Sequence, residues 1–382
     1  MLNIAIISSQ YPSKNNHYAH TFVHQRSLYF QNLGYKITVL VPSIIADEYT
    51  FDGVTVELTS AKNIAQKLTS FDCIYLHLLH IKKPRDEVSG EVIYNSIIGN
   101  NIPVAMYIHG AEVQKVLSRK FEMSYSLKSL ITMMYKDFYY IPKVAKFYKR
   151  LMLAGNYCIA TPSLWMKNEA ESNLGVELKN VNIIPNGIDT NKFKPLHTEK
   201  YNKRLLSIRQ LTSSKYAVDL SIQMMVFLPE YILDLYGKGP KLDEYKKMAK
   251  NLGVIERINF IEELIPNSEM PFVMNKYKYF VCPTRMDAQG VSMCEAMACG
   301  CIVITNSNTA IPEFVNNGKN GICSDTPEEM AKKISELNNN IELSSIISCE
   351  ARNSMLKLDI NVMLNKELNM LKLLVDKKLV DA

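Results

Sequence analysis

The sequence lacks the features that mark membrane-spanning, secreted or repetitive proteins. Its 382 residues contain no apolar run of about 18 or more residues, so no membrane-spanning helix is expected. There is no internal repeat and no low-complexity tract. The first residues, 1–7, carry no basic leader and are better explained as a buried strand than as a signal peptide.

Cysteine pairs of the kind that bind metals or form redox sites are also missing. The eight cysteines include no Cys-x-x-Cys pair, and several fall within apparent core elements, so we expect reduced thiols in a cytosolic protein. Cys299 and Cys301 flank one glycine. Without a second pair, they are interpreted as small core residues and not as metal ligands.

Positive charge is present, but it is concentrated in one segment. The formal net charge is +6, and residues 113–151 hold nine Lys or Arg, two Asp or Glu, and eight Phe or Tyr. This pattern fits a solvated helical face with core aromatics, and it equally fits an interfacial surface that meets anionic lipid. No recognised nucleic-acid motif accompanies the segment, so no nucleic-acid partner is expected.

Apolar strand patterns alternate with helical patterns in two successive blocks. In the first block a helix is expected over about 21–32, and the expected strands are 4–7, 36–41, 73–78, 104–108 and 157–160. A polar, basic stretch over 192–203 follows and reads as a linker. In the second block helices are expected at 218–225 and 242–251, with strands at 204–209, 231–237, 258–261, 279–281 and 302–305. The pattern predicts an α/β protein with two doubly wound domains that face a central cleft.

The stretch from Asp287 to Gly300 carries two carboxylates on either side of a loop that leads into a helix. The helix N-terminus at Gly290 offers free backbone N–H groups and a positive dipole end, which suit a phosphate. Glu295, one turn into the helix, is placed to accept hydrogen bonds from the vicinal hydroxyls of a sugar. The local pattern therefore indicates a nucleotide-sugar site.

Three more stretches complete a recognisable set, namely Ile108-His109-Gly110-Ala111-Glu112, Ile184-Pro185-Asn186-Gly187-Ile188-Asp189, and 209–215. With 287–300 they resemble the retaining glycosyltransferases of the GT-B fold, in the large family (family 4) that builds bacterial cell-envelope polysaccharides. The resemblance runs from the first strand to about residue 330. Its strongest element is the carboxylate pair with seven residues between, followed by Ala-Met-Ala-x-Gly.

The resemblance implies how the donor diphosphate is held. Arg209 and Lys215, which follow a strand of the second block, would neutralise its charge. The backbone amides of Gly290, Val291 and Ser292 would assist. No Asp-x-Asp occurs in the chain, so neither a metal nor any other cofactor is expected.

The resemblance also implies the contacts to the sugar and the nucleoside. Glu295 would bind the ribose hydroxyls, Asp287 the hydroxyls of the donor sugar, and Gln289 belongs to the same donor-binding loop. Gly237 matches the Gly-x-Gly-Pro motif of the family, near the nucleotide. His109 matches the histidine near the sugar phosphate of the reacting bond, so His109, Asp287, Arg209 and Lys215 are the catalytic candidates. Same-face attack, with the departing phosphate accepting the proton, would retain the anomeric configuration.

Several positions depart from the family pattern. The family usually has Glu at the place of Asp287, and the spacing from Arg209 to Lys215 is one residue longer than the common one. Tyr216 replaces the usual glycine, the loop over 9–17 lacks paired glycines, and Glu262 stands where a glycine often follows the strand. These departures leave the identity of the donor sugar open.

The predicted activity is transfer of a hexose or N-acetylhexosamine from a nucleotide sugar, UDP-linked by preference, to a glycan or lipid-linked acceptor. GDP-mannose is the alternative donor, and a nucleotide-sugar epimerase or a non-catalytic partner subunit are the other classes. The expected domains are 1–195 for the acceptor, 196–360 for the donor, and a helix over 361–382 that packs back towards the N-terminal domain. The expected location is cytoplasmic, peripheral on the inner face of the cell membrane through residues 113–151.

Overall fold

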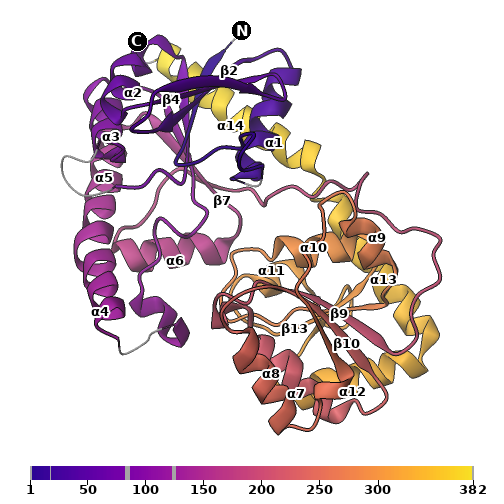
Figure 1. The fold of residues 1–382 in the computed structure, drawn as a ribbon. Helices are drawn as coiled ribbons and strands as arrows, with labels where there is room; N and C mark the ends of the chain where they lie inside the picture. The colour runs from indigo at the N-terminus through magenta and orange to yellow at the C-terminus, as the bar shows by residue number, and fades with distance from the viewer. Residues whose placement is uncertain (1, 18, 82–86, 123–125, 381–382) are drawn as a thin grey trace. The chain divides into compact units, whose positions relative to one another are not determined.

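The computed structural model describes residues 2–17, 19–81, 87–122 and 126–380, with the backbone only for 377–380. The chain divides into two compact units, each built on one sheet (Figure 1). The first unit comprises Met1–Ser118, Met123–Ile184 and Leu364–Ala382, and the second comprises Arg119–Glu122 and Pro185–Met363. The division therefore falls before the polar 192–203 stretch, and the last helix belongs largely to the first unit.

The first unit contains an eight-stranded sheet in the order β3-β4-β2-β1-β5-β6-β7-β8. Its strands are β1 (Asn3–Ser8), β2 (Lys36–Pro42), β3 (Asp47–Phe51), β4 (Val54–Thr59), β5 (Cys73–His77), β6 (Val104–Tyr107), β7 (Tyr157–Thr161) and β8 (Val181–Ile183). All neighbouring pairs are parallel except β3 with β4. Because β5 and β6 are parallel neighbours, their carboxyl ends lie side by side.

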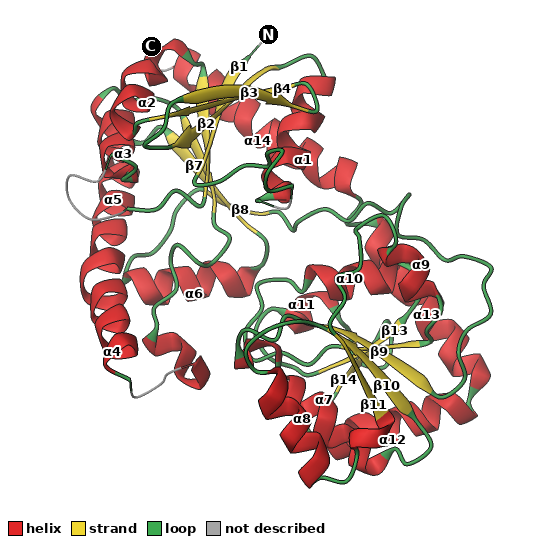
Figure 2. Ribbon diagram, in the orientation of Figure 1, coloured by secondary structure: helices red, strands yellow, loops and turns green. Residues whose placement is uncertain are grey.

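Helices lie on both sides of this sheet (Figure 2). They are α1 (Thr21–Asn32), α2 (Ala61–Lys67), α3 (Gly90–Gly99), α4 (Leu127–Met133), a π-helical turn η3 (Met134–Tyr140), α5 (Ile141–Ala154), α6 (Leu164–Leu174) and most of α14 (Ile360–Val380). Short 3-10 turns add η1 (Leu68–Ser70) and η2 (Leu117–Glu122). The strands β1, β5, β6 and β7 are almost wholly buried, as expected for parallel strands covered on both faces.

The second unit contains a six-stranded parallel sheet in the order β11-β10-β9-β12-β13-β14. Its strands are β9 (Arg204–Ile208), β10 (Ile232–Tyr236), β11 (Ile258–Ile261), β12 (Tyr279–Val281), β13 (Ile302–Thr305) and β14 (Ile322–Cys323). Its helices are α7 (Val218–Met224), α8 (Leu242–Asn251), α9 (Met270–Asn275), α10 (Val291–Ala298), α11 (Ile311–Phe314), α12 (Pro327–Asn339) and α13 (Ile341–Leu356), with 3-10 turns η4 (Ser214–Tyr216), η5 (Met225–Phe227) and η6 (Ile255–Arg257). The strand order reverses between β9 and β12, which is where open α/β sheets bind ligands.

The predicted α/β fold with two doubly wound domains is confirmed. The hairpin of β3 and β4 was not predicted, although Asp52 and Gly53 at its turn are a typical hairpin pair. Its first strand shows no apolar alternation, because most of its side chains are exposed. In the described part of the chain, no helix combines the length and apolar character needed to cross a bilayer.

Candidate functional site

In the second unit, an Asx turn shapes the loop before α10. Oδ1 of Asp287 accepts hydrogen bonds from the backbone N–H of Gln289 at 3.1 Å and of Gly290 at 2.8 Å. Gly290 has φ +77, a left-handed conformation that favours glycine. One oxygen of Asp287 therefore folds the loop, and the Gly290 amide that was predicted to contact phosphate is already used by Asp287.

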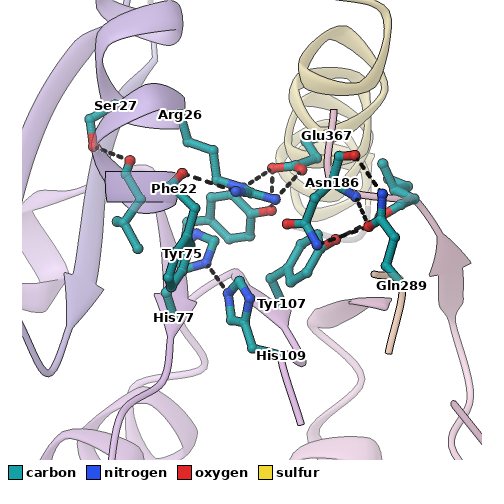
Figure 3. A network of polar contacts seen from close by, with 12 residues as sticks. Phe22, Arg26, Ser27, Tyr75, His77, Tyr107, His109, Asn186, Gln289 and Glu367 are labelled. Carbon is teal, nitrogen blue, oxygen red and sulfur yellow. Dashed lines mark hydrogen bonds and ion pairs between the residues drawn. The ribbon is translucent and has the colours of Figure 1, made fainter. Parts of the chain in front are cut away.

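The side chain of Gln289 is directed into the protein and not towards a ligand. Its Oε1 accepts from the backbone N–H and the Nδ2 of Asn186, at 2.7 and 3.0 Å, and its Nε2 donates to the Asn186 carbonyl at 2.9 Å (Figure 3). Only 1% of Gln289 is exposed. This arrangement gives the Gln289 side chain a positioning role, so any donor contact at this residue falls to its backbone.

The Pro-Asn-Gly-Ile-Asp turn is held at three successive residues. Asn186 is clasped by Gln289, and a Cβ on Gly187 would lie 2.4 Å from the Cα of Ile360 at the start of α14. Ile188 exchanges backbone hydrogen bonds with the same region of the chain. The turn needs glycine because two backbones approach closely there, which explains its specific sequence by packing.

Two cations predicted to hold the diphosphate share one aromatic ring. The guanidinium carbon of Arg209 lies 5.6 Å from the centre of the Tyr216 ring, and Nζ of Lys215 lies 5.4 Å from it. Arg209, just after β9, donates to the carbonyl of Cys282 at 2.8 Å and reaches Ser292 Oγ at 3.5 Å. Its buried Nε has no hydrogen-bond partner.

No carboxylate among the described residues pairs with Arg209 or Lys215, which is unusual for an arginine that is only 6% exposed. A buried guanidinium without an acidic partner keeps an unneutralised positive charge. An anionic ligand such as a diphosphate would supply the missing charge.

A cavity of about 590 Å³ opens beside Arg209. Its lining combines the ends of parallel strands, two tyrosines and two glycines, and it includes Ile208, Arg209, Gln210, Thr212, Tyr216, Tyr236, Gly237, Lys238, Gly239, Glu263, Leu264, Ile265, Met270 and Ser292. A Cβ on Gly237 would lie 2.0 Å from the Arg209 carbonyl oxygen, so a side chain there would displace the residue that carries the cation. The cavity thus brings Arg209, Gly237 and Ser292 together, and their role in donor binding stays a prediction.

Glu263 also borders this cavity and was not singled out from the sequence. The signal was available, because Glu263 follows β11 and the carboxyl ends of parallel strands meet at one edge of the sheet. The other predicted donor-site residues are not among the lining residues, and they are Lys215, Asp287, Gln289, Gly290, Val291 and Glu295.

Glu295 lies on α10 and is largely enclosed by the protein. Burial raises its pKa to about 7, although the positive charge of Lys192 lowers it. The carboxyl group is therefore balanced between its neutral and charged forms near neutral pH. A group in this state both donates and accepts hydrogen bonds, which suits contacts to hydroxyls.

In the first unit, His109 follows β6 and contacts a second histidine at the end of β5. Nε2 of His109 lies 3.0 Å from Nδ1 of the fully buried His77 (Figure 3). The backbone N–H of His109 donates to Glu112 Oε1 at 2.6 Å. Burial, reinforced by the charge of Arg26, holds the pKa of both histidines well below the usual value. His109 is therefore a neutral hydrogen-bonding group at pH 7. His77 was missed because it reads as an ordinary strand residue.

A buried ion pair lies close to the two histidines (Figure 3). Arg26 of α1 donates to both carboxylate oxygens of Glu367 of α14, each at 2.8 Å, and its guanidinium carbon lies 4.5 Å from the centre of the Tyr107 ring (Figure 3). Tyr75 donates to the same carboxylate at 2.6 Å. No sequence signal connects these residues, because Arg26 and Glu367 are 341 positions apart.

The described residues contain no group of three or more His, Cys, Asp or Glu side chains arranged to hold a metal ion. The predicted absence of a metal requirement stays a prediction. The predicted donor-binding residues all belong to the second unit, and His109 belongs to the first.

The chain is similar to known proteins in sequence and in fold. Residues 188–354 match the family model described as glycosyl transferases group 1. An uncharacterized glycosyltransferase from Haemophilus influenzae is 27% identical over 199 residues, which cover 50% of this chain and 53% of that protein. A GDP-mannose-dependent alpha-(1-6)-phosphatidylinositol monomannoside mannosyltransferase from Mycolicibacterium smegmatis is 29% identical over 159 residues, which cover 36% of this chain and 41% of that protein. The chain thus spans about half, or less, of the length of these relatives.

A crystal structure of Anabaena HepE in complex with UDP and glucose is similar over nearly the whole chain. It covers 97% of this chain and 100% of HepE, with a TM-score of 0.72 and 13% sequence identity. At this identity the likeness establishes the fold, and that fold is the GT-B architecture of two Rossmann-like domains.

Proposed function

We propose that this chain is a glycosyltransferase that moves a hexose or N-acetylhexosamine from a UDP-linked donor to a glycan acceptor in cell-envelope polysaccharide synthesis. The observation that carries the proposal is Arg209, which lines the cavity of about 590 Å³ and has no acidic partner among the described residues. Lys215, which also has no acidic partner among those residues, lies near the same tyrosine ring as Arg209. Breaking the bond between sugar and phosphate leaves negative charge on the diphosphate. Fixed cations placed where that charge develops lower the barrier.

The proposed mechanism needs no metal, because the side chains and amides supply the positive field. Val291 and Ser292 present the first free amides of α10, while the Gly290 amide is held by Asp287. The second oxygen of Asp287 would accept hydrogen bonds from the donor sugar. Attack on the same face, with the departing phosphate taking the proton, would retain the anomeric configuration and would need no separate base.

GDP-mannose is the second candidate donor. The Mycolicibacterium relative is named as a GDP-mannose-dependent enzyme, and its sequence is 29% identical to this chain over 159 residues. HepE, whose structure contains UDP and glucose, shares the fold alone. We favour UDP and treat GDP as the competing outcome of the experiment below.

The acceptor is assigned to the first unit. A cavity of about 640 Å³ there lies between the loop after β1 and the hairpin of β3 and β4, with polar and aromatic residues such as Asn15, Asp47 and Tyr49 in its lining. Aromatic faces and amide or carboxylate groups are the side chains that bind sugars. Because residues 113–151 are strongly basic, we further propose a lipid-linked acceptor and work at the inner face of the cell membrane.

Calorimetric titration with UDP, GDP, ADP and CMP, without metal and with a chelator present, tests the donor site. We expect UDP to bind most tightly and the chelator to leave its affinity unchanged. Selective binding of GDP would indicate a GDP-linked donor in place of a UDP-linked one. Binding only after metal addition would refute the metal-free site.

Absence of binding to every nucleotide would favour the non-catalytic partner subunit. A second assay supplies the matching nucleotide sugars without acceptor. Conversion of the donor to an isomer in that assay would indicate an epimerase and overturn the transferase.

A further inference from the structure

One continuous helical rod in the first unit, formed by α4, η3 and α5, divides into halves with opposite burial (Figure 1). In α5 the apolar side chains face the core, and Ile141, Val144, Phe147, Tyr148 and Leu151 are buried. In α4 no residue is buried, and in η3 only two are. The half that contacts solvent is nevertheless rich in large apolar side chains.

These exposed side chains form a stripe along one side of the helix. Leu127, Ile131, Met134 and Phe138 are 74%, 59%, 61% and 68% exposed. They are separated by four, three and four residues, a spacing that places side chains on one helix face. We call these four residues the α4–η3 stripe. Exposed patches of this kind mark interaction surfaces.

The exposed charges of the rod are of one sign. Its acid, Asp137, is buried and accepts hydrogen bonds from the backbone amides of Val116 and Leu117. The exposed charged side chains of the rod are basic, and they are Lys128, Lys146, Lys149 and Arg150.

We infer that the α4–η3 stripe inserts into the headgroup boundary of a membrane that contains anionic lipid. The inference rests on the membrane association proposed above and names the surface that makes it. An apolar stripe on a helical rod whose exposed charged side chains are all basic is complementary to an anionic bilayer surface. A second copy is a poorer occupant, since two such faces would bring lysines against lysines.

The structure also shows which basic residues are less suited to lipid contact. Lys143 forms an ion pair with Glu91 at 2.7 Å, and Arg150 donates to Asn95 at 2.7 Å. Their charges are held against α3. The strongest contribution to binding should therefore come from α4 and η3 and not from the polar face of α5.

The test compares two triple variants of the full chain. The stripe variant, Leu127→Ser, Ile131→Ser and Phe138→Ser, removes three of the four apolar side chains of the stripe. The control variant, Phe272→Ser, Ile341→Ser and Ile346→Ser, changes apolar residues of the second unit with comparable exposure. Each protein is sedimented with vesicles of phosphatidylcholine alone and of equal parts phosphatidylcholine and phosphatidylglycerol. Circular dichroism and nucleotide titration establish that both variants remain folded and keep the donor site.

We expect the unaltered protein and the control variant to bind the phosphatidylglycerol vesicles, and the stripe variant to bind about 100-fold more weakly. Equal binding by all three proteins, or none by the unaltered protein, would overturn the inference. A dimer that the stripe variant disrupts, without vesicle binding, would assign the stripe to self-association and overturn it as well. Because nucleotide binding is measured separately, failure of the donor site gives a different result.

Discussion

Two buried arginines, one in each unit, lie near tyrosine rings but differ in what neutralises them. Arg26 is 3% exposed and is paired with both oxygens of Glu367, whereas Arg209 is 6% exposed and contacts a carbonyl and a hydroxyl. The paired arginine joins two helices of the fold. The arginine without an acid retains a charge that a ligand can neutralise. Burial is therefore common to both arginines, and the acidic partner is the difference on which we base the proposal that Arg209 binds a ligand.

The same contrast extends to the other polar groups at the strand ends. In the first unit burial keeps His77 and His109 neutral, and the charge of Arg26 is matched by Glu367. In the second unit Arg209 and Lys215 leave a positive site. His109 thus gives the first unit a neutral hydrogen-bonding group, which suits a sugar, whereas the second unit offers positive charge, which suits a phosphate.

The largest effect is expected from removal of the arginine without an acid. Arg209→Ala should lower kcat/KM for transfer by about 1000-fold, roughly 4 kcal/mol, because the cation acts on charge that grows in the transition state. Nucleoside diphosphate affinity should also fall, while the free energy of unfolding changes little. Initial rates, calorimetry and urea unfolding measure the three quantities. A variant that lost stability and kept its nucleotide affinity would show that Arg209, like Arg26, has a structural role.

Removal of the paired arginine should act in the opposite way. Arg26→Met leaves Glu367 buried without its partner and should lower the free energy of unfolding by about 3 kcal/mol. Adding Glu367→Leu should restore most of that stability, since an apolar pair needs no neutralisation. Urea unfolding of the single and double variants tests this. If the single variant is as stable as the unaltered protein, the ion pair does not hold the helices together.

The smallest effect concerns Glu295, whose pKa burial raises to about 7. The charged carboxylate is the better hydrogen-bond acceptor for ribose hydroxyls, so nucleotide affinity should rise about threefold between pH 6 and pH 8 beyond the rise seen in Glu295→Gln. The sign for stability is opposite, because a carboxyl whose pKa is higher in the folded state loses stability as pH rises from about 4.5 to 7. Glu295→Gln should remove that loss. If nucleotide affinity changes identically with pH in the two proteins, Glu295 does not contact the nucleotide.

Local and periodic features of this chain were predictable from its sequence. The α1 helix has the predicted bounds, and the strand that precedes Arg209 was located because short apolar runs between turn residues are local signals. The loop of Asp287 was also located. The sequence did not reveal that one Asp287 oxygen closes the loop or that Gln289 clasps Asn186, because both depend on tertiary contacts. The Arg26–Glu367 pair was unpredictable for the same reason.

The path of α14 has a consequence for synthesis of the chain. The first unit is interrupted at Ile184 and completed only from Leu364 onward, so residues of the second unit are made before the first unit has all of its parts. Arg26 emerges early, while the carboxylate that neutralises it is added more than three hundred residues later. During translation Arg26 therefore lacks the acid that neutralises it in the finished structure, and the second unit is synthesised before the first unit is complete. Synonymous codon changes that slow elongation between the codons of Arg26 and Glu367 should lengthen the time for which the incomplete first unit is exposed to chaperones and proteases.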